Sequence, residues 1–433
     1  MWPVTTQRNS HGVMEIGGVS LVDIAAEFGT PIYVYDERTL RQTARGFRNA
    51  FTAAYPQSRV VYAAKAFLTT AIVQILHQEG LGLDVVSGGE LAVGLRSGMP
   101  PSEISLHGNN KSREELQEAL DAGIGMVIVD NVHDIDLLAP LVVRRETPIQ
   151  VMLRINPGVD VHTHRKISTG LADSKFGLPL VFGQAETAVA RLVGTPGLNL
   201  VGYHAHVGSQ LFDSEATVSA IDELLSFAAA MRDRHGVELQ HLSPGGGFGI
   251  AYVEGDRPMG PGKWATMLAN AVRIGCDRHT LPLPALTIEP GRAIAGPAGV
   301  ALYTVGAIKD LPGIRTYVAV DGGMADNIRP ALYEAVYSAE IANRQAGGVV
   351  SDVTIAGKYC ESGDVLIDEI DLPPLVPGDL LALPAAGAYC LSMASNYNMA
   401  LKPAVVLVDG GSVRLIRRRE TYDDLLRCDV PIG

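Results

Sequence analysis

The sequence predicts an α/β fold: a (β/α)8 TIM barrel accompanied by a second, all-β domain. Short apolar runs with strand character recur from residue 60 to residue 289, and stretches with helical periodicity separate them. After about residue 291 the helical stretches give way to short β-rich runs broken by Gly, Pro and Asp. Strict alternation of strand and helix is typical of a parallel barrel with helices outside.

Eight runs are interpreted as the barrel strands: Val60–Lys65, Gly82–Ser87, Ile104–Gly108, Met126–Asp130, Ile149–Asn156, Leu200–Val207, Leu239–Gly245 and Leu286–Glu289. Helices are expected at Glu37–Ala54, Thr70–Gln78, Gly89–Ser97, Ser112–Gly123, Asn131–Val143, Leu180–Val193, Ala216–Arg234 and Gly262–Arg278. Thr70 is a candidate helix cap, and Ser112 with Glu115 forms a capping box. The alternative is a doubly wound open sheet, but no G-x-G-x-x-G follows the first strand.

The second domain is predicted from six β-rich runs: Val300–Ile308, Thr316–Val320, Asp352–Ala356, Asp379–Leu383, Ala404–Val408 and Val413–Arg417. The first 35 residues also have β character and are expected to join this domain. We therefore predict a barrel over residues 36–291, and a β-sandwich or barrel-like domain formed by residues 1–35 with 292–433.

Length and composition limit the classes of partner that the protein is expected to have. A chain of 433 residues is long enough for two domains. Its net charge of −12 argues against nucleic acid or an anionic membrane as partner. The four cysteines show no CxxC spacing, so neither a disulfide framework nor a zinc site is expected. We see no signal peptide and no apolar run of about 18 residues, so a cytoplasmic location without a membrane partner is expected.

Polar residues follow the predicted strands, where barrel enzymes carry their chemistry. Lys65 ends the first strand. A lysine in a partly desolvated pocket becomes a nucleophile for a carbonyl, whereas the ordinary alternative is a lysine that reaches solvent.

His204 and His206 lie two residues apart on a predicted strand, so their side chains should point to the same side. Metal binding lacks a nearby third ligand, so a histidine stacked on a flat ring or a buried, hydrogen-bonded histidine is preferred.

The glycine run from Gly245 to Gly249 follows the seventh strand, where consecutive backbone N–H groups can converge on a phosphate, although a flexible turn is the simpler interpretation. Glu289 ends the eighth strand, where a carboxylate can keep a pyridine nitrogen protonated or pair with Arg292. With Lys65, these features suggest pyridoxal 5'-phosphate. In the second domain, Arg329 with Tyr333 suits a carboxylate ligand, although a surface ion pair is the commoner use.

These motifs resemble those of the meso-diaminopimelate decarboxylases, a family in the barrel-type (alanine racemase-like) class of pyridoxal-phosphate enzymes. The likeness runs from TPIYVYD at Thr30 to SNYN at Asn398. It includes YAAKA, DVVSGGE, GNNKS, HAHVGSQ, PGGGFG, EPGR, DGGMADNIRPALY and GAYCLSMASNYN. The segments HTHRKISTGLADSKFG and CESGD set the chain closer to this family than to ornithine or arginine decarboxylases.

The resemblance implies a role for each matching position. Lys65 would link covalently to the cofactor, and Cys360 would reprotonate the α-carbon. The cofactor would be held by Lys65, Asp84, His206, Ser209, Gly246, Gly247, Glu289, Gly291, Arg292 and Tyr389. The substrate, meso-diaminopimelate, would be bound by Arg292, Arg329, Tyr333, Glu361 and Tyr389. In this family Cys360 and Glu361 come from the second subunit of a homodimer.

The implied activity is decarboxylation of meso-diaminopimelate to L-lysine. Three alternatives stay open: a related decarboxylase with another amino-acid or polyamine-precursor substrate, a non-catalytic regulatory homologue, and a racemase. Retention of Lys65 and Cys360 argues against the non-catalytic homologue. Racemases lack the CESGD segment that this sequence contains.

Overall fold

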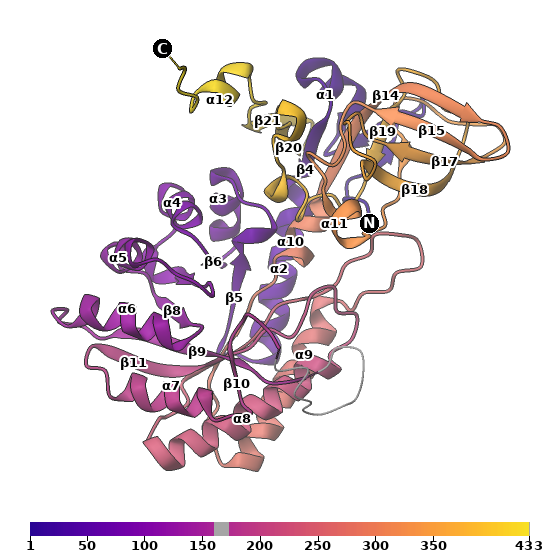
Figure 1. The fold of residues 1–433 in the computed structure, drawn as a ribbon. Helices are drawn as coiled ribbons and strands as arrows, with labels where there is room; N and C mark the ends of the chain where they lie inside the picture. The colour runs from indigo at the N-terminus through magenta and orange to yellow at the C-terminus, as the bar shows by residue number, and fades with distance from the viewer. Residues whose placement is uncertain (160–172, 433) are drawn as a thin grey trace. The chain divides into compact units, whose positions relative to one another are not determined.

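The structure is a computed structural model that describes residues 1–159 and 173–432 (Figure 1). Most of the HTHRKISTGLADSKFG segment lies outside the described residues. The chain divides into two compact units. The β unit comprises Met1–Thr43, Ile250–Arg257 and Arg292–Gly433, and the barrel unit comprises Ala44–Gly249 and Pro258–Gly291. The predicted domain boundaries, at residues 36 and 291, stay a prediction.

The barrel unit contains a closed ring of eight parallel strands, so the predicted (β/α)8 barrel is confirmed. The strands are β5 (Ser58–Ala63), β6 (Gly82–Val85), β7 (Ile104–Leu106), β8 (Met126–Val129), β9 (Ile149–Asn156), β11 (Leu198–His204), β12 (His241–Gly245) and β13 (Ala285–Ile288). Pairing of β13 with β5 closes the ring, and the two-residue strand β10 (Leu178–Pro179) adds to the side of β9. The strands run in the same direction, which brings their carboxyl ends to one face.

The helices that alternate with these strands are α2 (Glu37–Ala54), α3 (Thr70–Gln78), α4 (Gly88–Arg96), α5 (Arg113–Ala122), α6 (Val132–Val142), α7 (Gln184–Val193), α8 (Glu215–His235) and α9 (Pro261–His279). The predicted capping box is confirmed, since Ser112 and Glu115 bond to each other's backbone N–H groups. Two details were wrong. Thr69, not Thr70, caps α3, and α7 begins four residues later than expected because the left-handed Gly183 precedes it.

The β unit is built on a mixed sheet in the order β18-β17-β15-β14-β4-β20-β21, with β19 and β16 branching from β14. Its strands are β4 (Ile32–Asp36), β14 (Gly299–Leu311), β15 (Arg315–Val320), β16 (Glu340–Ile341), β17 (Ser351–Ala356), β18 (Val365–Leu372), β19 (Leu380–Leu383), β20 (Ala404–Asp409) and β21 (Ser412–Arg417). The early strand β4 pairs antiparallel with β14 and parallel with β20. The sheet therefore joins the start of the sequence to its last third.

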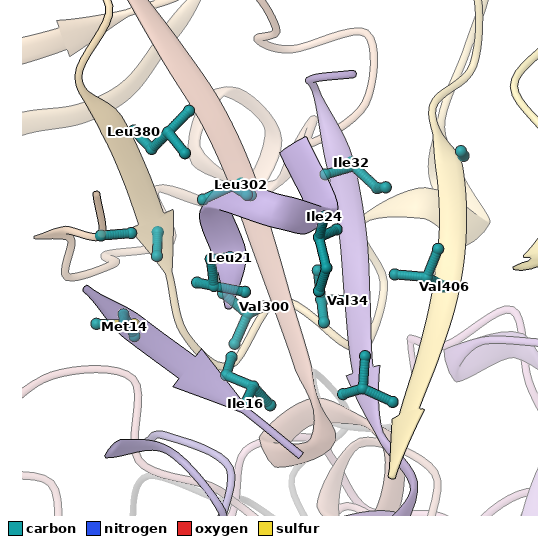
Figure 2. Close-up of a cluster of buried hydrophobic side chains, with 14 residues drawn as sticks. Met14, Ile16, Leu21, Ile24, Ile32, Val34, Val300, Leu302, Leu380 and Val406 are labelled. Carbon is teal, nitrogen blue, oxygen red and sulfur yellow. The ribbon is translucent and has the colours of Figure 1, made fainter. Parts of the chain in front are cut away.

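Smaller elements complete the β unit: a three-stranded sheet of β1 (Gln7–Arg8), β2 (Met14–Ile16) and β3 (Val19–Ser20), and the helices α1 (Leu21–Phe28), α10 (Arg292–Ala295), α11 (Arg329–Tyr333) and α12 (Tyr422–Leu426). The sequence did not predict α1 or β18. Figure 2 shows a core cluster in which apolar side chains of α1, β2, β4, β14 and β20 meet. Among the described residues, no helix has the length and apolarity needed to cross a bilayer.

Candidate active site

Lys65 follows β5 on a single 3-10 turn, Ala64–Ala66, instead of ending the strand. Its side chain is exposed, whereas Ala64 and Ala66 on either side are buried. A Cβ on Gly291 would lie 3.0 Å from Cβ of Ala66 and 3.1 Å from Cβ of Ala63. The backbone after β13 thus packs closely against the turn that carries Lys65.

Glu289, directly after β13, is held in one orientation by two hydrogen bonds. Oγ of Ser243 donates to its Oε1 at 2.6 Å, and Nε2 of His204 lies 3.1 Å from its Oε2. Burial alone would raise the pKa of Glu289, but the His204 and Ser243 contacts lower it below its usual value. The carboxyl group is therefore an anion in the barrel, and both of its oxygens accept a hydrogen bond.

Two more residues extend this cluster. Nε2 of His107 lies 3.2 Å from Oδ1 of Asp84, and the His107 ring packs edge-on against His204 with 5.1 Å between centroids. Burial raises the pKa of Asp84 to about 6, although His107 opposes the shift. Burial also lowers the pKa of His204 to about 4, so this histidine is neutral at pH 7. The interpretation of His204 as a buried, hydrogen-bonded histidine fits this geometry.

This cluster contains three side chains that could together bind a metal ion. Ligand atoms of His107, His204 and Glu289 lie within 4.8 Å of one another, so these three could hold an ion. Both Glu289 oxygens are already used by Ser243 and His204, however. The geometry therefore favours a polar hydrogen-bonded site over a metal site. His206 is not in this trio.

His206 lies in the loop after β11, because the strand ends at His204. The strand predicted to run to Val207 therefore ends three residues earlier, and the shared side of the two histidines stays a prediction. Nδ1 of His206 accepts a hydrogen bond of 3.3 Å from the backbone N–H of Gly246. Burial, followed by the charge of Lys65, lowers the pKa of His206 to about 3. The imidazole is thus neutral at pH 7.

The glycine run that begins at the end of β12 requires glycine for two distinct reasons. Gly245 and Gly247 adopt φ of 83° and 92°, which L side chains rarely adopt. Gly246 has ordinary φ, but a Cβ there would lie 2.1 Å from the backbone oxygen of Glu289. The loop therefore follows the end of β13 closely with its backbone. Ser209, predicted to contact phosphate, is exposed in the loop after β11.

A buried ion pair supports the ends of β7 and β8. Nζ of Lys111 lies 2.7 Å from Oδ2 of Asp134 and donates to the backbone oxygen of Gly108 at 2.7 Å. The same Asp134 oxygen accepts the N–H of Asp130 at 2.9 Å. Lys111 and Asp134 are 3% and 0% exposed, so each charge depends on the other.

The β unit contains a second polar cluster, formed by Arg292, Arg329 and three tyrosines. Nη1 of Arg292 donates to the hydroxyl of Tyr252 at 2.5 Å, and its guanidinium lies 4.7 Å from the Tyr389 ring centroid. Arg329 donates to the hydroxyl of Tyr337 and lies 4.6 Å from the Tyr252 ring centroid. Three of the predicted site residues, Arg292, Arg329 and Tyr389, therefore lie in one cluster.

The remaining predicted residues of the β unit are exposed. Tyr333, at the end of α11, is 60% exposed. Cys360 and Glu361 lie in an exposed loop before β18. That loop is tied to a second one, since the N–H of Cys360 donates to Oδ1 of Asn398 at 3.0 Å and the Tyr397 hydroxyl donates to the Cys360 backbone oxygen at 3.3 Å.

Tyr252, Tyr337 and Ser243 were not predicted from the sequence as site residues. Tyr252 follows the glycine run by a few residues, and Tyr337 is four residues after Tyr333. Their importance rests on contacts between segments far apart in the sequence.

Comparison with known proteins gives concordant matches. Residues 39–296 match the family described as pyridoxal-dependent decarboxylase, pyridoxal binding domain. Diaminopimelate decarboxylase of Bacillus subtilis (strain 168) is 47% identical over 427 residues, which cover 99% of this chain and 97% of that protein. The enzyme of the same name from Mycobacterium tuberculosis (strain ATCC 25618 / H37Rv) is 42% identical, covering 99% and 98%. The crystal structure of diaminopimelate decarboxylase from M. jannaschii in co-complex with L-lysine superposes with a TM-score of 0.92 at 34% identity, covering 100% and 99%.

Proposed function

We propose that this chain, which belongs to the pyridoxal-dependent decarboxylases and among them to the diaminopimelate decarboxylase family, converts meso-2,6-diaminopimelate to L-lysine and carbon dioxide. The observation that carries the proposal is the match to diaminopimelate decarboxylases over 99% of the chain. A match of that extent covers both the barrel unit and the β unit. It therefore includes the segments assigned to substrate binding as well as the motifs assigned to the cofactor.

The residues of the barrel unit fit pyridoxal 5'-phosphate. Lys65 offers an exposed primary amine for the cofactor aldehyde. Glu289 is an oriented anion suited to a protonated pyridine nitrogen, and the neutral His206 offers a flat ring for stacking. The backbone of Gly246 and Gly247 can approach a phosphate without a side chain between them.

We assign the other cofactor contacts by the same family resemblance. Asp84 supports the cluster around Glu289, and Ser209 and Gly291 contribute to the phosphate loop. The resemblance also assigns cofactor contacts to Arg292 and Tyr389. The cation–π contact between Arg292 and Tyr389 supports their assignment as a pair.

Substrate recognition is assigned to charged and phenolic groups of the β unit. Arg329 and Arg292, with Tyr333 and Tyr389, bind the distal carboxylate and its neighbours. Glu361 binds the distal ammonium group. A substrate with a carboxylate and an ammonium group at its far end needs charges of both signs, which distinguishes it from ornithine.

Each residue then has a defined task in the reaction. When bound, pyridoxal phosphate accepts the electrons released as the bond to the departing carboxylate breaks. Lys65 Nζ would hold the cofactor through its aldehyde, and Glu289 would face the pyridine nitrogen as an anion. Cys360 Sγ would supply the proton that replaces the lost carboxylate on the α-carbon. One proton is taken up and one carbon dioxide is released for each lysine formed.

We further propose that the enzyme is a cytoplasmic homodimer in which Cys360 and Glu361 serve the partner's site. Their exposure within a single chain supports this. Mixing the inactive variants Lys65→Ala and Cys360→Ala under subunit exchange tests it. Random exchange would restore about a quarter of the wild-type sites, because half of the dimers carry one intact site. No recovery despite demonstrated exchange would contradict the shared site.

The substitution Glu361→Ala tests the substrate assignment. We expect KM for meso-diaminopimelate to rise roughly tenfold or more, since a hydrogen bond to a charged group is lost, while the bound cofactor keeps its colour. Glu369→Ala removes another exposed carboxylate, on β18, and serves as the control with unchanged kinetics. Unchanged kinetics of Glu361→Ala would refute its role in reading the ammonium group.

A further inference from the structure

Arg329 is a buried cation whose charge is not balanced by an acid. The residue is 6% exposed, and among the described residues of the β unit no carboxylate forms an ion pair with it. Its guanidinium instead donates to the hydroxyl of Tyr337 and lies 4.6 Å and 5.3 Å from the ring centroids of Tyr252 and Tyr337. A buried charge without such partners would be strongly unfavourable, so these tyrosines determine where Arg329 can point.

The hydrogen bonds around Tyr337 have a definite direction. A guanidinium can only donate, so the Tyr337 oxygen accepts from Arg329 and its own hydrogen points elsewhere. The Sγ of Cys390 lies 3.2 Å from that oxygen. The thiol has a different acceptor for its hydrogen, the backbone oxygen of Ala388 at 3.7 Å. The sequence of donors therefore runs from Arg329 through Tyr337 and Cys390 to the Ala388 backbone.

We propose that Tyr337 is a positioning residue, whose hydroxyl is oriented by Cys390 and fixes Arg329 for the carboxylate of the substrate. The inference rests on the proposed function and adds a specificity determinant to it. Tyr337 touches neither reacting atoms nor cofactor in this account. It acts on binding through Arg329, and Cys390 acts on binding through Tyr337.

The surroundings of Cys390 agree with that role. The residue is completely buried, and burial raises the pKa of its thiol to about 11, so the sulfur keeps its hydrogen at pH 7. It directly follows Tyr389, which holds φ of 61° in the left-handed region. Bonding of Sγ to the Ala388 oxygen thus also ties the chain on both sides of Tyr389.

The variant that isolates the hydroxyl is Tyr337→Phe. It keeps the ring, and with it the edge-to-face packing on Tyr252 at 5.4 Å and the face presented to Arg329. Only the acceptor for Arg329 and the donor to Cys390 are lost. Tyr203→Phe is the matched control, because Tyr203 is fully buried in the barrel unit and its hydroxyl has no hydrogen-bond partner among the described residues.

Steady-state kinetics of the holoenzyme test the proposal. We expect Tyr337→Phe to raise KM for meso-diaminopimelate roughly ten- to hundredfold, the range for a lost hydrogen bond to a charged group, with kcat within about threefold of wild type. Tyr203→Phe should change neither constant. An unchanged KM, or a fall in kcat together with loss of cofactor, would overturn the positioning role.

A binding measurement separates this inference from the proposed function. Pimelate carries two carboxylates and no amine, whereas cadaverine carries two amines and no carboxylate. Tyr337→Phe should weaken pimelate binding and leave cadaverine binding unchanged, whether or not wild type turns over meso-diaminopimelate. Equal loss for both ligands would overturn the inference, while absence of wild-type turnover with selective loss of pimelate would count against the proposed function alone.

Cys390 provides a second pair of variants should Tyr337→Phe fold poorly. Cys390→Ser keeps an acceptor for the Tyr337 hydroxyl and a donor to the Ala388 backbone, whereas Cys390→Ala removes both. We expect Cys390→Ala to raise KM and Cys390→Ser to restore it to within about threefold of wild type. Equal KM values for both variants would contradict the role of Cys390.

Discussion

The carboxylate of Glu289 offers a prediction that separates charge from shape. In Glu289→Gln the amide oxygen can still accept from Oγ of Ser243, now 2.6 Å from Oε1. The amide nitrogen then faces Nε2 of His204, and that neutral histidine can accept by changing tautomer. Both hydrogen bonds of the Glu289 side chain therefore have a counterpart in the variant. The negative charge is lost, and the His204 proton moves to the buried Nδ1, which has no partner among the described residues in either tautomer.

We expect the loss of the charge to lower kcat for meso-diaminopimelate roughly 100- to 1,000-fold, comparable to removal of one electrostatic group from a water-poor site. The free energy of unfolding should change by less than about 1 kcal/mol, because packing and hydrogen bonding are kept. Steady-state carbon dioxide release, with bound cofactor measured by absorbance and unfolding measured in urea, gives both quantities.

Glu79→Gln is the control for this experiment. Glu79 is also buried in the barrel unit, where it pairs with Arg45. Its neutralisation should lower stability and leave kcat within about twofold, since it has no part in the chemistry. A kcat for Glu289→Gln within threefold of wild type would refute the role of the Glu289 charge, and so would a loss that follows unfolding.

Further predictions concern the barrel unit. Lys111→Met should lower the free energy of unfolding by about 3–5 kcal/mol, because it leaves the Asp134 carboxylate buried without its cation. Urea denaturation measures this loss, and a smaller loss in the double variant Lys111→Met/Asp134→Leu would confirm the cause. Gly246→Ala places a Cβ 2.1 Å from a backbone oxygen and should weaken cofactor affinity in absorbance titrations; wild-type affinity would contradict the tight approach. His204 and His206 have pKa values lowered to about 4 and 3, so the unfolded state binds more protons below about pH 6.5. Asp84 and Asp326, whose pKa values burial raises to about 6, act in the opposite direction, so the histidine contribution is measured against the variant His204→Gln/His206→Gln. The stability of wild type relative to this variant should fall as pH decreases from 6.5 toward 4, and a difference that does not depend on pH would contradict the neutral burial of the two histidines.

The barrel was predictable because its signals are local. Alternation of apolar runs with amphipathic stretches identifies each strand and helix, and the capping box of Ser112 with Glu115 was found with its boundary. The predicted start of α7 was wrong, because the left-handed backbone conformation of Gly183 precedes the helix and delays its first turn. The strand β18 was missed because its charged residues interrupt the apolar pattern expected of a strand.

The site was only partly predictable for a different physical reason. Single residues at strand ends, such as Lys65 and Glu289, could be found from position and chemistry. Their partners could not, since Ser243 reaches Glu289 across 46 residues and Tyr337 reaches Cys390 across 53. Nothing in the sequence near Tyr337 indicates that its hydroxyl connects a buried arginine to a thiol.

The most direct measurement is product analysis of the purified protein with pyridoxal phosphate and meso-diaminopimelate, with L-ornithine, L-lysine and L-arginine in parallel. The proposed function predicts equal amounts of L-lysine and carbon dioxide from meso-diaminopimelate, and no turnover of the other three. Turnover of one of those amino acids in its place, or no turnover by protein that has bound the cofactor, would contradict it.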